Sequence, residues 1–125
     1  VIQADGGTRT ASITGGFVPM ILALRKIYQA GEIKAFPVKE NLAAFSVGIV
    51  NQCPMLDLKY DEDKNAEVDM NVVMLASGEF VEVQGTAEGK TYSRDQLNLM
   101  LDLAEKGIRS HIAAQNEILG NVLSA

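Results

Sequence analysis

One uncharged apolar segment constrains the fold more than any other part of this chain. Residues Leu42–Val50 read LAAFSVGIV, with apolar side chains at successive positions rather than at every second one. A strand of this kind presents apolar side chains on both faces, so other elements must cover both. The chain has 125 residues, which is enough for one domain with such a core. We therefore expect Leu42–Val50 to be a strand buried on both faces.

Three further segments predict the rest of the sheet. Asn51-Gln52 indicates a turn, and the alternating segment Pro54–Tyr60 then predicts the second strand of a hairpin. Strands are also expected over Val68–Leu75 and Glu79–Gln84, followed by a loop of small residues over Gly85–Gly89.

Helices are expected at both ends of the chain. Apolar residues recur every three or four positions from Thr10 to Ala30, which indicates one buried helix face, and Pro19 should kink this helix. Ser93 with Gln96 predicts a capping box for a second helix that runs to about Leu119. The order of elements predicts an α+β fold with an antiparallel sheet and two long helices. The expected buried positions of the first helix are Ile13, Phe17, Met20, Ile21, Leu24, Ile27 and Tyr28.

Charge and cysteine content disfavour several classes of protein. The net charge of −5 argues against a polybasic surface for nucleic acid or membrane on this chain. Cys53 is the only cysteine, which excludes a disulfide framework or a multi-cysteine zinc site within the chain. The longest uncharged runs, 10–24 and 41–56, are short and interrupted by proline, so we expect no membrane contact. One thiol and five methionines fit a reducing cytosol, and we expect a cytoplasmic protein.

The first residues suggest a longer protein. Val1–Ala4 read as the end of a buried strand, and no basic segment precedes an apolar stretch. We expect no signal peptide and a chain that is part of something longer.

The segment Asp5–Thr10, DGGTRT, is the first candidate site. A glycine turn leads into a helix N-terminus, where free amides and the helix dipole favour an anion. The Thr8 hydroxyl and the Arg9 guanidinium would complete a phosphate or oxyanion cradle. The alternative is an ordinary turn, with Thr8 as a helix cap and Arg9 in solvent. Spacing alone favours that alternative.

An acidic cluster is the second candidate site. It contains Asp61, Glu62, Asp63, Glu67 and Asp69, and Asp69 stands at the start of an apolar strand. Two carboxylates together with substrate phosphate oxygens suffice to hold Mg²⁺, so Asp63 with Asp69 would form such a site. The alternative is a solvated loop followed by an aspartate that caps a backbone amide, and composition alone favours it.

Four ordered segments carry a resemblance to a known family. They are DGGTRTASITG (5–15), LAAFSVGIV (42–50), LDLKYDEDKNAEVDMNVVM (56–74) and EVQGTAEG (82–89), and MLDLAEKGIR (100–109) follows in the last helix. Together they closely resemble bacterial ribonuclease PH, a phosphorolytic 3′ exoribonuclease family. Because the segments keep their order across nearly the whole chain, this resemblance is far more specific than any single motif.

The resemblance implies a fold and an activity. The fold would be ribosomal protein S5 domain 2-like, with residues 1–125 forming the C-terminal part of a single ribonuclease PH domain whose N-terminal half is absent. The activity would be that of a phosphate-dependent 3′-to-5′ exoribonuclease, or tRNA nucleotidyltransferase, that trims the 3′ ends of tRNA precursors and releases nucleoside diphosphates. The family assembles into a homohexameric ring.

The resemblance also assigns residues. The family's phosphate-binding Gly-Thr-Arg corresponds to Gly7, Thr8 and Arg9, and its pair of functional aspartates corresponds to Asp63 and Asp69. Inorganic phosphate would be the co-substrate, and the aspartates would hold Mg²⁺ or, for Asp69, protonate the leaving oxygen. Two alternatives remain: a subunit of a related exosome-type or polynucleotide-phosphorylase ring, and a non-catalytic truncated subunit or interaction domain.

Overall fold

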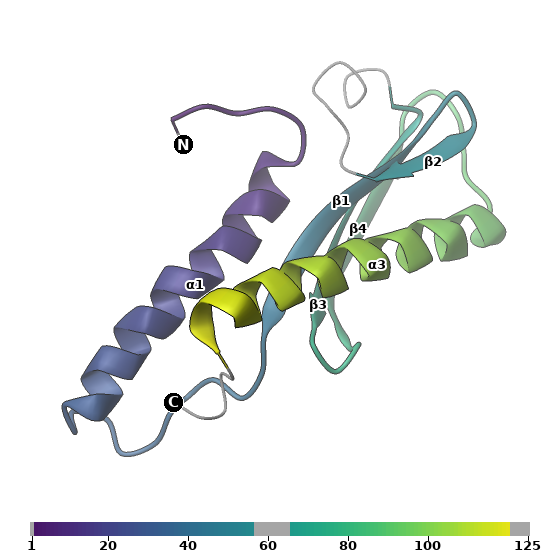
Figure 1. Cartoon of the computed structure of the whole chain (residues 1–125). Coiled ribbons are helices and arrows are strands. Elements are labelled where there is room, and N and C mark those ends of the chain that lie inside the picture. The colour runs from purple at the N-terminus through teal and green to yellow at the C-terminus, as the bar shows by residue number, and fades with distance from the viewer. Residues whose placement is uncertain (1, 57–65, 121–125) are drawn as a thin grey trace.

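Within its described residues, the chain forms a four-stranded antiparallel sheet and two long helices (Figure 1). The computed structural model describes residues 2–56 and 66–120. The sheet has the strand order β2-β1-β3-β4, so β1 and β3 are its central strands. The elements are α1 (Thr8–Gln29), β1 (Leu42–Val50), β2 (Cys53–Leu56), β3 (Val68–Leu75), β4 (Phe80–Ala87) and α3 (Arg94–Leu119).

The expected burial of β1 on both faces is confirmed. α3 covers one face, where its apolar stripe packs against alternate residues of β1 and β3. α1 lies against the other face and is joined to it by Thr14, whose hydroxyl accepts from the Ala44 amide at 2.9 Å and donates to the Ala44 carbonyl at 3.0 Å. The main core consists of Ala43, Val47, Ile49, Val68, Met70, Val72, Met74, Met100, Ala104, Ile108 and Ile112.

Gln115 is the polar residue in the apolar stripe of α3, and it joins three elements. Its amide nitrogen donates to the Thr14 carbonyl of α1 at 2.9 Å and to the Leu42 carbonyl of β1 at 3.0 Å. Its side-chain oxygen accepts from Asn41 at 3.2 Å. Burial of this side chain is tolerated because its polar atoms have partners.

Several element boundaries follow the sequence closely. β1 and β3 have the predicted bounds, and the capping box of Ser93 and Gln96 opens α3, which ends before Gly120. Asn51 and Gln52 both have positive φ, as the tight turn of the β1–β2 hairpin requires. Of the predicted strand Pro54–Tyr60, positions 57–60 lie outside the described residues.

The prediction for β4 is wrong at its end. The strand continues through residues 85–87, which we expected to form a loop, and pairs there with β3. Gly85 serves packing rather than a turn: a Cβ at this position would lie 2.9 Å from the Met70 methyl carbon and 3.0 Å from the Tyr92 hydroxyl. A glycine in a strand can mark such a close approach.

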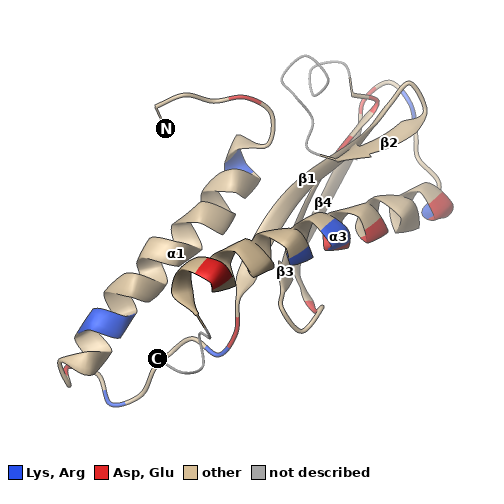
Figure 2. Ribbon diagram, in the orientation of Figure 1, with Lys and Arg blue, Asp and Glu red and all other residues tan. Residues whose placement is uncertain are grey.

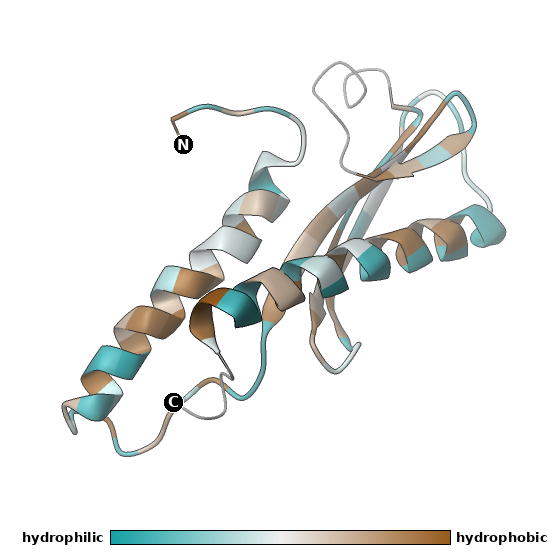
Figure 3. Ribbon diagram, viewed as in Figure 1, coloured by the Kyte–Doolittle hydropathy of each residue, from teal (hydrophilic) through white to brown (hydrophobic). Residues whose placement is uncertain are grey.

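The prediction for α1 is wrong about the kink at Pro19 and about one position of the apolar face, Met20. The helix begins at Thr8, and it is continuous through Pro19 with no sharp bend along its length (Figure 1). Phe17 and Ile21 are buried, but Met20 is 45% exposed. Met20 lines an apolar groove of about 710 Å³ between α1 and the connection to β1. The middle of α1 carries no charged residue and is apolar (Figures 2 and 3).

None of the helices in the described part of the chain meets the length and apolarity needed to cross a membrane.

The close contact between α3 and β1 provides a test of the packing. A Cβ on Gly107 would lie 2.5–2.8 Å from three ring carbons of Phe45. Gly107→Ala should therefore lower the free energy of unfolding by about 1–3 kcal/mol, measured by urea denaturation. Gly16→Ala is the matched control, because a Cβ there meets nothing within 4 Å and alanine favours a helix. A Gly107→Ala protein as stable as the wild type would contradict this packing.

Candidate active site

The start of α1 has the features of an anion site. Gly7 is the N-cap residue, with φ 70°, a left-handed conformation that glycine adopts readily. Gly7 has no side chain that could cap the first-turn amides, and no acidic residue occupies the first turn. The free amides and the helix dipole therefore favour a negative ligand at this position.

The turn before α1 is held by its own hydrogen bonds. The Gly6 amide donates to the Asp5 carboxylate at 2.8 Å, and the Thr8 hydroxyl donates to the Asp5 carbonyl at 2.7 Å. The alternative that Thr8 caps the helix is wrong, because Thr8 is already the first helical residue.

A chain of polar side chains, two of them buried, fixes this helix start above the sheet. Thr10 Oγ1 lies 2.9 Å from the Gly7 carbonyl and 2.8 Å from Ser46 Oγ on β1. The Ser46 hydroxyl donates to Asn71 Oδ1 on β3 at 2.8 Å. Because the Ser46 hydroxyl proton goes to Asn71, the Thr10 hydroxyl must be the donor in its contact with Ser46. Its single proton is therefore shared between the Gly7 carbonyl and Ser46 Oγ. This chain of hydrogen bonds, which we call the Ser46 relay, therefore connects the glycine turn to both central strands.

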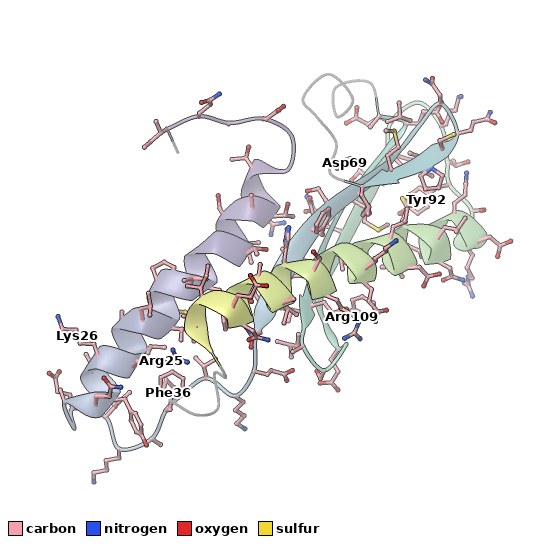
Figure 4. All side chains as sticks on the ribbon, viewed as in Figure 1. Arg25, Lys26, Phe36, Asp69, Tyr92 and Arg109 are labelled. Atoms are coloured by element: carbon pink, nitrogen blue, oxygen red, sulfur yellow. The ribbon has the colours of Figure 1, made fainter. Side chains whose placement is uncertain are left out.

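The structure brings Asp69 to the same pocket as the glycine turn. Asp69 and Asn71 point to one face of β3, and Ser46 is the partner of Asn71 on β1. Asp69 lies at the end of the sheet nearest the start of α1 (Figures 1 and 4). The pocket has a volume of about 240 Å³, and its lining residues are Asp5, Gly7, Thr8, Arg9, Ser46, Asp69 and Asn71.

The remaining members of the acidic cluster are placed differently. Asp61, Glu62 and Asp63 lie outside the described residues, so the pairing of Asp63 with Asp69 stays a prediction. Glu67 accepts from Lys90 at 2.8 Å and belongs to a surface ion pair. Within the residues that the structure describes, no group of three His, Cys, Asp or Glu side chains is arranged to hold a metal ion. The expected Mg²⁺ site at Asp63 and Asp69 therefore stays a prediction.

Arg9 reaches from α1 across the sheet to Glu82 on β4. Its Nη2 donates to both carboxylate oxygens, at 3.0 and 2.8 Å, and the two side chains are 52% and 36% exposed. These hydrogen bonds lower the pKa of Glu82 below its ordinary value and raise the pKa of Arg9, so both groups are charged at neutral pH. Glu82 faces the same side of the sheet as Asp69, because it pairs with Val73.

The comparisons with known proteins identify the family. Residues 41–107 match the model of the 3′ exoribonuclease family, domain 2. The chain belongs to the 3′ exoribonuclease family. The matched segment contains Ser46, Asp69, Asn71 and Glu82, whereas the glycine turn precedes it.

Relatives extend this match over nearly the whole chain. Ribonuclease PH of Bacillus cereus strain G9842 is 60% identical over 125 residues, which cover 99% of this chain and 51% of that protein. Ribonuclease PH of Syntrophomonas wolfei is 57% identical over 120 residues, covering 96% of this chain and 50% of that protein. The chain thus spans about half the length of these members of the family.

A solved structure supports the fold. Rrp46 from rice superposes with a TM-score of 0.64, covering 98% of this chain and 51% of that one, at 14% sequence identity. At that identity the likeness concerns the fold, and it agrees with the expected α+β class and its ribonuclease PH-like arrangement.

The Ser46 relay can be tested by removing its central hydroxyl. Ser46→Ala leaves the Asn71 oxygen and Thr10 without their shared partner and should destabilise the protein by about 1–2 kcal/mol. Ser110→Ala, an exposed change on α3, is the control and should change stability by less than about 0.5 kcal/mol. Equal denaturation midpoints for the two variants would show that the relay contributes nothing to stability.

Proposed function

We propose that this chain is the C-terminal half of a phosphate-dependent 3′ exoribonuclease subunit that trims the 3′ ends of tRNA precursors. The pocket shared by the α1 N-terminus, Arg9 and Asp69 supports this proposal most directly. It places groups that bind an anion next to a carboxylate, as a reaction between phosphate and a phosphodiester requires. The 60% sequence identity to a ribonuclease PH also supports the proposal.

In the proposed reaction, inorganic phosphate is the nucleophile. One of its oxygens forms a bond to the last phosphodiester phosphorus of the RNA, and the bond from that phosphorus to the 3′ oxygen of the preceding nucleotide breaks. The products are a nucleoside 5′-diphosphate and an RNA shortened by one nucleotide. Because one phosphoryl linkage replaces another of similar energy, the reverse reaction should also run when nucleoside diphosphate is abundant.

The residues of the pocket have separate roles in this reaction. The first-turn amides of α1, with Thr8 and Arg9, hold the attacking phosphate, and Gly7 lets the backbone turn so that these amides face it. Arg9 also offsets the negative charge that accumulates when two phosphate groups meet. Asp69 acts on the leaving 3′ oxygen, either by protonating it or by holding a cation beside it.

Mg²⁺ fits the donor set of the proposed site. Asp69 and Asn71 line the pocket, and Mg²⁺ prefers oxygen ligands such as carboxylates. Asp69, with Asp63 as the family resemblance implies, would hold the ion. When bound, Mg²⁺ neutralises charge on the reacting phosphate oxygens.

The proposal includes an assembly and a location. We place the complete subunit in a homohexameric ring in the cytoplasm, acting on RNA 3′ ends. A non-catalytic subunit is the less favoured alternative, because Gly7, Thr8, Arg9 and Asp69 are all present in one pocket.

Replacing the Asp69 carboxylate tests the proposed function. In the complete protein, Asp69→Asn keeps the size of the side chain but removes its charge, so release of nucleoside diphosphate from RNA should slow about 100-fold or more. Asp102→Asn, which makes the same change on the exposed side of α3, is the control and should retain activity. Circular dichroism checks that both variants fold. Equal activity of the two folded variants would contradict the proposal.

A further inference from the structure

The ion pair between Arg9 and Glu82 uses the guanidinium nitrogen, Nη2, that any bidentate contact of Arg9 with phosphate would need. Arginine binds a phosphate in bidentate fashion through one of two edges, Nη1 with Nη2 or Nε with Nη2, because its own side-chain carbons block the third. Nη2 belongs to both usable edges. Both contacts of Arg9 with Glu82 are made by Nη2, one to each carboxylate oxygen.

We infer that Glu82 is a built-in competitor of phosphate at Arg9. Its carboxylate holds the guanidinium beside the pocket before phosphate binds, and phosphate must displace it to make a bidentate contact. Glu82 therefore sets the affinity of the site for phosphate. This inference rests on the proposed function, since it takes phosphate as the ligand of Arg9.

The position and exposure of the pair support exchange rather than a permanent contact. Both side chains are partly exposed to solvent, and exposed ion pairs are weak enough for a stronger anion to replace. Glu82 also stays close to the site after displacement, because β4 holds it on the sheet face that carries Asp69 and Asn71.

The experiment measures the binding of inorganic phosphate alone to the complete protein, by calorimetry at fixed ionic strength. Glu82→Gln keeps the size of the side chain and removes its charge, so the dissociation constant for phosphate should fall about threefold to fivefold. Glu79→Gln is the matched control, since it removes the same charge from the same β3–β4 hairpin. This control should bind phosphate within about twofold of the wild type.

A second pair of variants separates this inference from the proposed function. Arg9→Lys keeps the charge but loses both bidentate edges, so phosphate should bind more weakly, and adding Glu82→Gln should then have little further effect. Unchanged or weaker binding in Glu82→Gln, or equal tightening in Glu79→Gln, overturns the role of Glu82 while the function stands. Unchanged binding in Arg9→Lys removes Arg9 from the phosphate site and overturns both.

Discussion

The attachment of α1 to the central strand β1 is the interaction on which the rest of the site depends. Thr14 bonds to both the amide and the carbonyl of Ala44, and Thr10 meets Ser46 one turn nearer the helix start. The opposite face of β1 is fixed by α3, which approaches closely at Gly107. Because β1 is held from both sides, the N-terminus of α1 has a set position above β3, and Asp69 is brought into its pocket.

The electrostatics of the site suit a reaction between anions in an acidic chain. The chain has a net charge of −5, yet the start of α1 combines uncapped amides with Arg9 and contains no acidic residue in its first turn. Asp69 and Glu82 lie on the adjacent sheet face. An anion therefore finds favourable charge mainly at the helix start, with carboxylates beside it, which suits the proposed binding of phosphate next to Asp69.

Local patterns in the sequence predicted much of this structure, and contacts between distant segments account for what they missed. The bounds of β1 and β3 and the caps of α3 follow from residues within each element. The pairing of Arg9 with Glu82, which are 73 residues apart, depends on the β3–β4 register and its irregularity between Val73 and Met74. Gly85 looks like a loop signal in the sequence, because the side chains that leave no room for a Cβ there, Met70 and Tyr92, come from other segments. The glycine turn and Asp69 were both recognised as candidates, but only the folded chain places them together.

Backbone amide shifts during a phosphate titration test the central claim most directly, namely that the N-terminus of α1 is the phosphate site. In the complete protein labelled with ¹⁵N, inorganic phosphate should move the amide signals of Thr8, Arg9 and Thr10 in a saturable way. The amides in the last turn of α1, at Lys26 and Tyr28, should stay in place. Saturable shifts confined to another surface, or none at the start of α1, would contradict the account.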